Sequence, residues 1–157
     1  MCEGFTDIEY KYCKQITDKL YHHPLALLFL KPVDPITDGC PDYFDVIKEP
    51  MDLRTVKEKL NGCKYESSFQ WRNDVMKIWE NSIKYNAKHI LIKKITEKLK
   101  KISIKMMTNI PKTDVDLWYI QLQDASKELQ SFLKYNPSSS SGMSRSKSKS
   151  LHSNPYK

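Results

Sequence analysis

The chain has 157 residues, enough for one domain with a hydrophobic core, and its 39% hydrophobic and 29% charged residues are ordinary for a globular protein. The formal net charge is +7, but residues 1–137 hold 22 basic against 19 acidic side chains, so much of the excess lies in residues 138–157. This distribution argues against a body built mainly as a nucleic-acid groove. The apolar runs are too short to cross a bilayer, and the N-terminal residues lack the layout of a secretion signal.

Residues with metal-binding or catalytic potential do not form a recognisable constellation. The four cysteines (Cys2, Cys13, Cys40 and Cys63) lie far apart, without Cys-x-x-Cys spacing or a nearby histidine pair, so we expect free thiols in a reducing compartment and no metal site. The four histidines come without a nucleophile pattern or a Gly-rich phosphate loop. The sequence therefore predicts neither an enzyme nor a cofactor.

The first helix is predicted over about residues 6–22. It opens with a capping box, in which the Thr6 oxygen and the Glu9 side chain satisfy each other's exposed backbone donors. Pro24 prevents the helix from continuing. Its predicted inward face recurs every four residues and consists of Ile8, Tyr12, Ile16 and Leu20.

Residues 24–51 contain five prolines among aliphatic and aromatic side chains and show no periodicity. A connection this long is usually functional or disordered, and its apolar content argues against disorder. We therefore expect an ordered loop in which the prolines limit the entropy lost on folding. Within it, Phe44 and Ile47 are expected to be core residues.

Three more helices are predicted over about residues 52–62, 67–86 and 90–107. Asp52 is the expected N-cap of the first, and Ser67 opens the second. In the first and last of these helices the expected inward side chains recur at spacings of three and four. The expected inward side chains of the three helices are Leu53, Val56 and Leu60, then Phe69, Val75, Trp79 and Ile83, and finally Ile92, Ile95, Leu99, Ile102 and Met106.

An additional amphipathic helix is predicted within residues 111–136, after a break at Pro111. We expect its apolar seam to pack back on the bundle, because large exposed apolar patches are uncommon; a partner helix is the alternative. Residues 137–157 are Ser-rich and basic and are expected to form a disordered tail, for which nuclear import, phosphorylation, nucleic-acid contact and no specific role all stay open. The seam consists of Trp118, Leu122, Ala125, Leu129 and Phe132.

Because no stretch alternates as a strand does, the sequence predicts an all-α bundle. The stretch from Asn81 to Asn86, where the third helical pattern ends in Tyr85-Asn86, admits two interpretations. Asn is a common residue at the C-terminal end of a helix, since it tolerates the left-handed conformation. A neutral carboxamide can also recognise another neutral amide, such as that of an acylated lysine.

The layout of four helices with a long proline-rich loop between the first two resembles that of the bromodomain family. The loop motifs Pro32-Val33-Asp34-Pro35, Pro41 to Ile47 and Pro50-Met51-Asp52-Leu53 are similar to those of the family, and Asn81 with Tyr85-Asn86 resembles the end of its third helix. The resemblance covers residues 5–107, and the first 110 residues are assigned to this domain. It implies a left-handed four-helix bundle and recognition of acetylated lysine.

The resemblance also implies roles for individual residues. Asn86 is expected to donate a hydrogen bond to the acetyl carbonyl, and Tyr43 to act on the same oxygen through a water. Tyr85 is expected to help line the floor. Where the family usually has Trp-Pro-Phe, this chain has Leu27-Leu28-Phe29, so Leu27 and Leu28 form an altered shelf. The side chains expected to wall the acetyl methyl and the lysine stem are Phe29, Val33, Ile36 and Ile92.

The function expected from these residues is binding of acetylated lysine in histone tails or other nuclear proteins, with chromatin-complex subunits as possible partners and a nuclear location. One alternative is a protein-interaction scaffold that has kept the bundle but binds no acetyl-lysine, and works through the C-terminal helix. The other is nucleic-acid binding through the tail, which a steep salt dependence would reveal. No membrane partner is expected.

Overall fold

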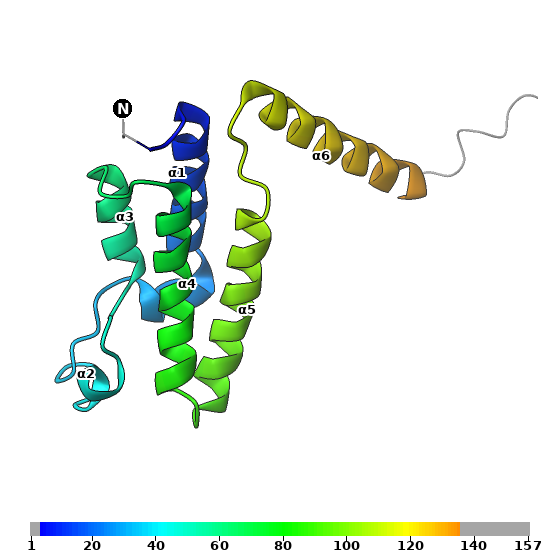
Figure 1. The fold of residues 1–157 in the computed structure, drawn as a ribbon. Coiled ribbons are helices and arrows are strands. Elements are labelled where there is room, and N and C mark those ends of the chain that lie inside the picture. The colour runs from blue at the N-terminus through cyan, green and yellow to red at the C-terminus, as the bar shows by residue number, and fades with distance from the viewer. Residues whose placement is uncertain (1–3, 136–157) are drawn as a thin grey trace, which may run out of the picture. The chain divides into compact units, whose positions relative to one another are not determined.

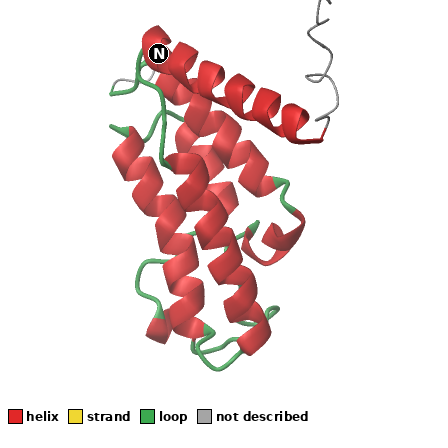
Figure 2. Cartoon of the chain, turned by 90° about the vertical axis from the view of Figure 1, so that its right-hand side faces the viewer, coloured by secondary structure: helices red, strands yellow, loops and turns green. Residues whose placement is uncertain are grey.

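The structure is a computed structural model and describes residues 4–135 (Figure 1). The chain divides into two units, one up to Ile120 and one from Gln121 onward. The first unit contains a bundle of helices, and every regular element of the described residues is helical (Figure 2), so the all-α prediction is confirmed. The bundle helices are α1 (Asp7–Tyr21), α3 (Leu53–Asn61), α4 (Ser68–Tyr85) and α5 (Ile90–Met107).

The helices of the bundle begin where the sequence supplies a cap. The Thr6–Glu9 capping box is present, with the Glu9 backbone N–H donating to Thr6 Oγ1 at 3.1 Å. Asp52 accepts the Thr55 backbone N–H at 2.9 Å at the start of α3. Ser67 caps α4 through its side-chain oxygen. These caps satisfy backbone donors that have no partner inside the helix, and they place the helix starts within about a turn of the prediction.

The core of the bundle is built around two fully buried tryptophans of α4. Trp71 donates its indole N–H to Thr17 Oγ1 at 3.0 Å. Trp79 meets the ring of Phe29 edge to face, with 5.2 Å between ring centroids. Phe69 was expected here as well, but that prediction is wrong, because it is 67% exposed. It lies two residues before Trp71, and two residues turn a helix through about 200°.

The connection between α1 and α3 is ordered, and it contains two short helices that the sequence did not predict. These are the 3₁₀ helix η1 (Pro24–Phe29) and the single-turn helix α2 (Tyr43–Val46). Ile47 is buried as expected, but Phe44 is 48% exposed, so the expectation of a core role was wrong for that residue. In α2 the adjacent Tyr43 takes the buried position, and neighbours on a helix point about 100° apart.

Three side chains near the end of α4 hold this connection in place. Asn81 donates its amide N–H to the Glu49 carbonyl at 2.8 Å, and the Lys84 ammonium donates to the Val46 carbonyl at 2.8 Å. One turn after Asn81, the Tyr85 hydroxyl donates to the Asp42 carboxylate at 2.6 Å. Carbonyl groups in an irregular segment lack the regular backbone partners that a helix provides. The α4 side chains supply hydrogen bonds in their place, which explains how a long, proline-rich connection keeps one conformation.

Helix α6 (Asp114–Tyr135) follows Pro111 and contains the predicted apolar seam. Thr113 and Asp116 cap its start reciprocally, each backbone N–H donating to the other side chain at 3.1 Å. The packing of the seam against the bundle stays a prediction, and the predicted tail lies outside the described residues. Within the described range, no helix is both long and apolar enough to cross a membrane.

The cysteines only partly follow the sequence expectation. Cys13 is a buried free thiol, and burial, the larger cause, together with the nearby Glu9 carboxylate raises its pKa to about 12. Cys40 is also a free thiol and is partly exposed. Cys63, however, is disulfide-bonded, so the prediction of free thiols is wrong for this residue. It is also the one non-glycine residue of the described range with a positive φ, 51°.

Candidate ligand-binding pocket

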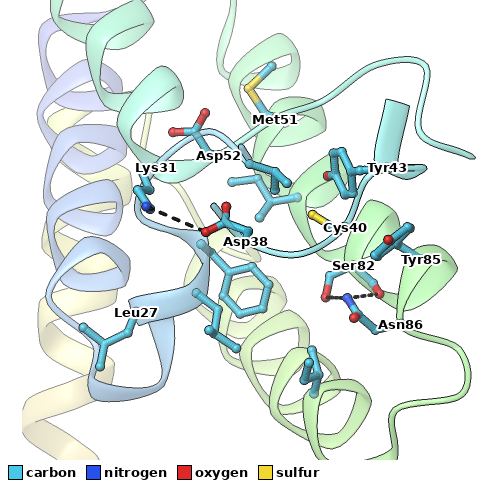
Figure 3. Close-up of a pocket in the computed structure, with 15 residues that line it drawn as sticks. Leu27, Lys31, Asp38, Cys40, Tyr43, Met51, Asp52, Ser82, Tyr85 and Asn86 are labelled. Atoms are coloured by element: carbon cyan, nitrogen blue, oxygen red, sulfur yellow. Dashed lines mark hydrogen bonds and ion pairs between the residues drawn. The ribbon is translucent and has the colours of Figure 1, made fainter. Parts of the chain in front are cut away.

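A cavity of about 310 Å³ lies between the α1–α3 connection and the facing ends of α4 and α5 (Figure 3). Most of its lining side chains are apolar or aromatic, and they come from η1, the connection, α2, α4 and α5. Its size is that of a site for a small group rather than for a folded partner. The lining residues are Leu27, Leu28, Phe29, Lys31, Val33, Asp38, Cys40, Tyr43, Met51, Asp52, Ile78, Ser82, Tyr85, Asn86 and Ile92.

The cavity brings together all but one of the residues that the sequence assigned to a site. These are Leu27 and Leu28 of the shelf with Phe29, Val33, Tyr43, Tyr85, Asn86 and Ile92. The exception is Ile36, which is 91% exposed and does not line the cavity. Its backbone N–H donates to Asp34 Oδ1 at 3.0 Å, in a tight turn that directs the side chain to solvent.

Asn86 ends α4 and is held by the turn below it. Its φ and ψ are −92° and 30°, so it does not adopt the left-handed conformation on which the simple capping interpretation rested. Its side-chain amide donates to the Ser82 carbonyl at 3.1 Å (Figure 3). The Ser82 hydroxyl in turn lies 2.8 Å from Thr96 Oγ1, which donates to the Ile92 carbonyl at 2.8 Å. This chain of bonds between α4 and α5 fixes the carboxamide at the cavity wall.

Two tyrosines stand edge to face at the side of the cavity formed by α2 and α4. The ring centroids of Tyr43 and Tyr85 are 5.0 Å apart, with an interplanar angle of 69°. The hydrogen bond to Asp42, ahead of burial, raises the pKa of Tyr85 to about 12. Burial, the largest cause, likewise raises the pKa of Tyr43. Both phenols are therefore neutral at physiological pH, and none of the side chains or backbone groups in residues 4–135 hydrogen-bonds the Tyr43 hydroxyl.

The two carboxylates that line the cavity are already engaged. Asp52 is buried and accepts both the Thr55 backbone N–H at 2.9 Å and the Thr55 hydroxyl at 2.6 Å. Asp38 accepts the Asp34 backbone N–H at 2.9 Å and lies 3.8 Å from the Lys31 ammonium. Both carboxylates are thus oriented by neighbouring donors, and Asp38 also has a cationic neighbour in Lys31.

Sequence reasoning missed several lining residues, of which Ser82 and Ile78 carry the most information. They precede Asn86 by four and eight residues, so all three lie on one face of α4. That spacing was available in the sequence and could have identified them. Cys40 and Met51 have no such signal, because their approach to the cavity depends on the path of an irregular connection.

Comparisons with known proteins point to one family. A family model described as Bromodomain matches residues 13–102. Bromodomain-containing protein C631.02 of Schizosaccharomyces pombe is 36% identical over 113 residues, which cover 70% of this chain and 16% of that protein. The SWR1 complex bromodomain subunit bdf1 of the same organism is 40% identical over 79 residues, covering 48% of this chain and 14% of that protein.

A solved structure matches the same part of the chain. It is the second bromodomain of Candida albicans Bdf1, described as bound to an imidazopyridine, and it aligns with a TM-score of 0.62 at 27% sequence identity. The alignment covers 65% of this chain and 99% of that domain. The fold and the family model together define the class of protein.

The chain belongs to the bromodomain family, whose members are acetyl-lysine reader modules and not enzymes. The resemblance drawn from the sequence is thereby confirmed, together with the bromodomain fold and its C-terminal helical addition. The chain spans a sixth or less of the length of the curated relatives it matches.

Proposed function

We propose that the cavity binds acetylated lysine, with the Asn86 carboxamide donating a hydrogen bond to the acetyl carbonyl. The observation that carries this proposal is the fixed orientation of Asn86 at the cavity wall. Its amide nitrogen donates to the Ser82 carbonyl at 3.1 Å and makes a second, longer contact of 3.5 Å with the Ser82 hydroxyl, which a ligand carbonyl at hydrogen-bond distance can replace. Since Ser82 is itself bonded to Thr96, the carboxamide needs little further ordering when a ligand arrives.

Tyr43 is the second polar group assigned to the ligand. Its hydroxyl is neutral and unused by the part of the protein described here, so it can bond a water that also meets the acetyl oxygen. Phe29, Val33 and Ile92 supply the apolar wall for the methyl group and the lysine stem. Leu27 and Leu28 extend that wall at the mouth, where both are largely exposed.

Discrimination against unmodified lysine follows from charge. A lysine ammonium is strongly hydrated, and burying it is costly unless a counter-charge is present. The two groups assigned to the acetyl oxygen, the Asn86 carboxamide and the Tyr43 phenol, are both neutral, so neither supplies a counter-charge where the ammonium would lie. Acetylation removes the charge and leaves a flat amide whose carbonyl can accept a hydrogen bond from the Asn86 amide.

The test is a calorimetric or NMR titration of acetylated and unmodified histone-tail peptides into the protein and into an Asn86→Ala variant. We expect only acetylated peptides to bind, and Asn86→Ala to weaken their binding by about 5- to 150-fold, as losing a donor worth about 1–3 kcal/mol to a buried carbonyl implies. Asn73→Ala is the matched control, since it makes the same change at an exposed position of α4.

Two results would count against the proposal. Equal binding of both peptide forms, unchanged by Asn86→Ala, would show that the pocket is assigned wrongly. A folded protein that binds no acetylated peptide would favour the alternative of an interaction scaffold that works through α6.

We further infer that the acetylated partner is a histone tail or another nuclear protein, and that the protein acts in the nucleus with chromatin-complex subunits. The similarity to a protein named as a subunit of the SWR1 complex supports this inference. The expected result is retention of the protein on acetylated nucleosomes but not on unmodified ones. Equal retention on both would contradict it.

A further inference from the structure

The positive charge of the folded part of this protein is concentrated on one helix. Helix α5 contains six lysines and a single acidic residue, Glu97. The rest of residues 1–137 holds 16 basic against 18 acidic side chains, so it is slightly negative without α5. The other long bundle helices mix the two signs, as α4 does with Arg72, Asp74, Lys77 and Glu80.

Four of these lysines form a straight stripe on the outer face of α5. Lys94, Lys98, Lys101 and Lys105 are spaced by four, three and four residues and are all exposed, so they line up on one side of the helix. At 1.5 Å of rise per residue, the stripe is about 16 Å long. The opposite side of α5 faces the core through Thr96, Leu99, Ser103 and Met107.

The stripe lysines have no anionic partner in the described part of the chain. Within the described residues, α5 forms one ion pair, between Lys100 and Glu80 at 3.3 Å, and Lys100 lies to one side of the stripe. Like charges three and four residues apart repel one another and destabilise a helix. An anion spread along the helix would remove that repulsion at every position of the stripe.

We propose that the stripe of Lys94, Lys98, Lys101 and Lys105 binds the phosphate backbone of duplex nucleic acid, without reading bases. Duplex DNA presents a regular line of negative charge, which a line of lysines can neutralise. Lysine is a point charge without the planar fork by which arginine recognises carboxylates in pairs, and α5 contains no arginine. Nor does the stripe include an aromatic or amide side chain that could read a base edge or stack on one.

The position of the stripe leaves the acetyl-lysine pocket open. Ile92 lines the cavity, and Lys94 comes two residues later, about 200° further round the helix. The two surfaces therefore lie on different sides of α5, the helix that Figure 1 shows at one edge of the bundle. A nucleic acid on the stripe and a peptide in the pocket can be bound at once. When both ligands belong to one complex, binding of the first raises the effective concentration of the second.

The experiment is a fluorescence-anisotropy titration of a short DNA duplex of arbitrary sequence with the full chain, repeated between about 50 and 200 mM salt. We expect the logarithm of the association constant to fall with the logarithm of salt concentration. In the variant K94Q/K98Q/K101Q/K105Q the slope should become shallower by about 3–4, at about 0.9 for each lysine contact removed. Binding at the lowest salt should weaken at least tenfold.

The matched control is the variant K11Q/K14Q/K19Q/K64Q. It removes the same charge from four exposed lysines outside α5, and it should keep most of the salt slope. The acetyl-peptide titration should be the same for the stripe variant as for the parent, which verifies that the bundle is intact and separates this proposal from the pocket assignment.

Three outcomes would overturn the proposal. An unchanged salt slope in the stripe variant would assign any DNA binding to the basic C-terminal residues instead. An equal loss in the control variant would mean that only net charge matters. Binding to polyglutamate but not to the duplex would make an acidic protein the ligand class.

Discussion

The inward face of α4 differs between its two halves, although one helix provides both. Along residues 68–79, which with the helices packed on them we call the closed half, Trp71, Val75 and Trp79 are fully buried and fill the space between the helices. Along residues 80–86, which with the cavity and the connection beside them we call the open half, Ser82 and Asn86 occupy the same face, next to a cavity of about 310 Å³. Small polar side chains at regular helical spacing therefore mark where the bundle stops packing against itself.

This difference separates two properties of the molecule. Truncating a side chain in the closed half leaves a cavity that the surrounding residues cannot fill, so the substitution should lower the free energy of unfolding. The open half already contains a cavity, and its polar groups either hydrogen-bond to near neighbours or have no partner within the described residues. Substitutions there should change the affinity for ligand while leaving the free energy of unfolding almost unchanged.

The largest effect expected in the closed half comes from Trp79→Ala. The indole is fully buried and packs against Phe29, so its loss should lower the free energy of unfolding by about 3–5 kcal/mol. Urea unfolding followed by circular dichroism measures this. Phe69→Ala, on the exposed side of the same helix, should stay within about 0.5 kcal/mol of the parent. Similar losses of unfolding free energy in both variants would contradict the assignment of the stability to the buried face of α4.

A smaller loss of stability is expected from Asp74→Ala. Its buried carboxylate accepts the Tyr65 hydroxyl at 3.0 Å and pairs with Lys59. Removing it leaves the buried phenol without an acceptor, which costs about 1–3 kcal/mol. The double variant with Tyr65→Phe should recover part of that loss in the same urea experiment, because it removes the unpaired donor. A double variant that simply adds the two single losses would contradict this assignment.

The sequence predicted the closed half well because its signals are local. Caps at Thr6, Asp52 and Ser67 locate the helix starts, and apolar spacing of three and four locates most of the buried faces. The prediction for Phe69 was wrong because an aromatic residue in the first turn of a helix can point to the core or to solvent. The choice depends on where the neighbouring helices lie. The correct choice depended on Trp71, whose indole N–H finds Thr17 more than fifty residues away in the chain.

In the open half, the sequence predicted only those residues that belong to a motif with a fixed spacing. Asn86, Tyr43 and Ile92 were found because each belongs to a motif with a definite register. The bonds that shape the connection, such as Asn81 to the Glu49 carbonyl, join an α4 side chain to an irregular backbone, and no periodicity encodes them. For the same reason the sequence could not exclude Ile36, which a local turn at Asp34 directs to solvent.

In the open half, Tyr43→Phe should affect binding and not folding. None of residues 4–135 bonds the Tyr43 hydroxyl, so its removal should change the free energy of unfolding by less than about 0.5 kcal/mol. The lost water-mediated contact to the acetyl oxygen, worth about 0.5–1.5 kcal/mol, should weaken acetyl-peptide binding by about two- to tenfold. Calorimetry and urea unfolding of one preparation measure both. A loss of stability without a loss of affinity would place Tyr43 with the closed half.

The smallest effect concerns the bond by which Tyr85 ties the connection to α4. Because the neutral phenol donates to Asp42, its pKa is raised from 10.0 to about 12. A raised pKa in the folded state means that this contribution to stability is complete below pH 10 and is lost as the pH rises through about 12. Asp42→Asn should therefore lower the pKa of Tyr85 toward 10, as measured by the phenolate absorbance against a Tyr85→Phe reference.

Measuring acetyl-peptide affinity as a function of pH tests whether the bond between Tyr85 and Asp42 contributes to ligand binding. Between pH 6 and 9, below the raised pKa, the Tyr85 phenol stays neutral and the bond to Asp42 stays intact, so affinity should not vary through this group. Asp42→Asn keeps an acceptor oxygen beside the phenol, so it should preserve most of the affinity over the same range. A pKa already at its ordinary value in the parent would mean that the bond to Asp42 does not persist in solution. The open half would then be held by Asn81 and Lys84 without Tyr85.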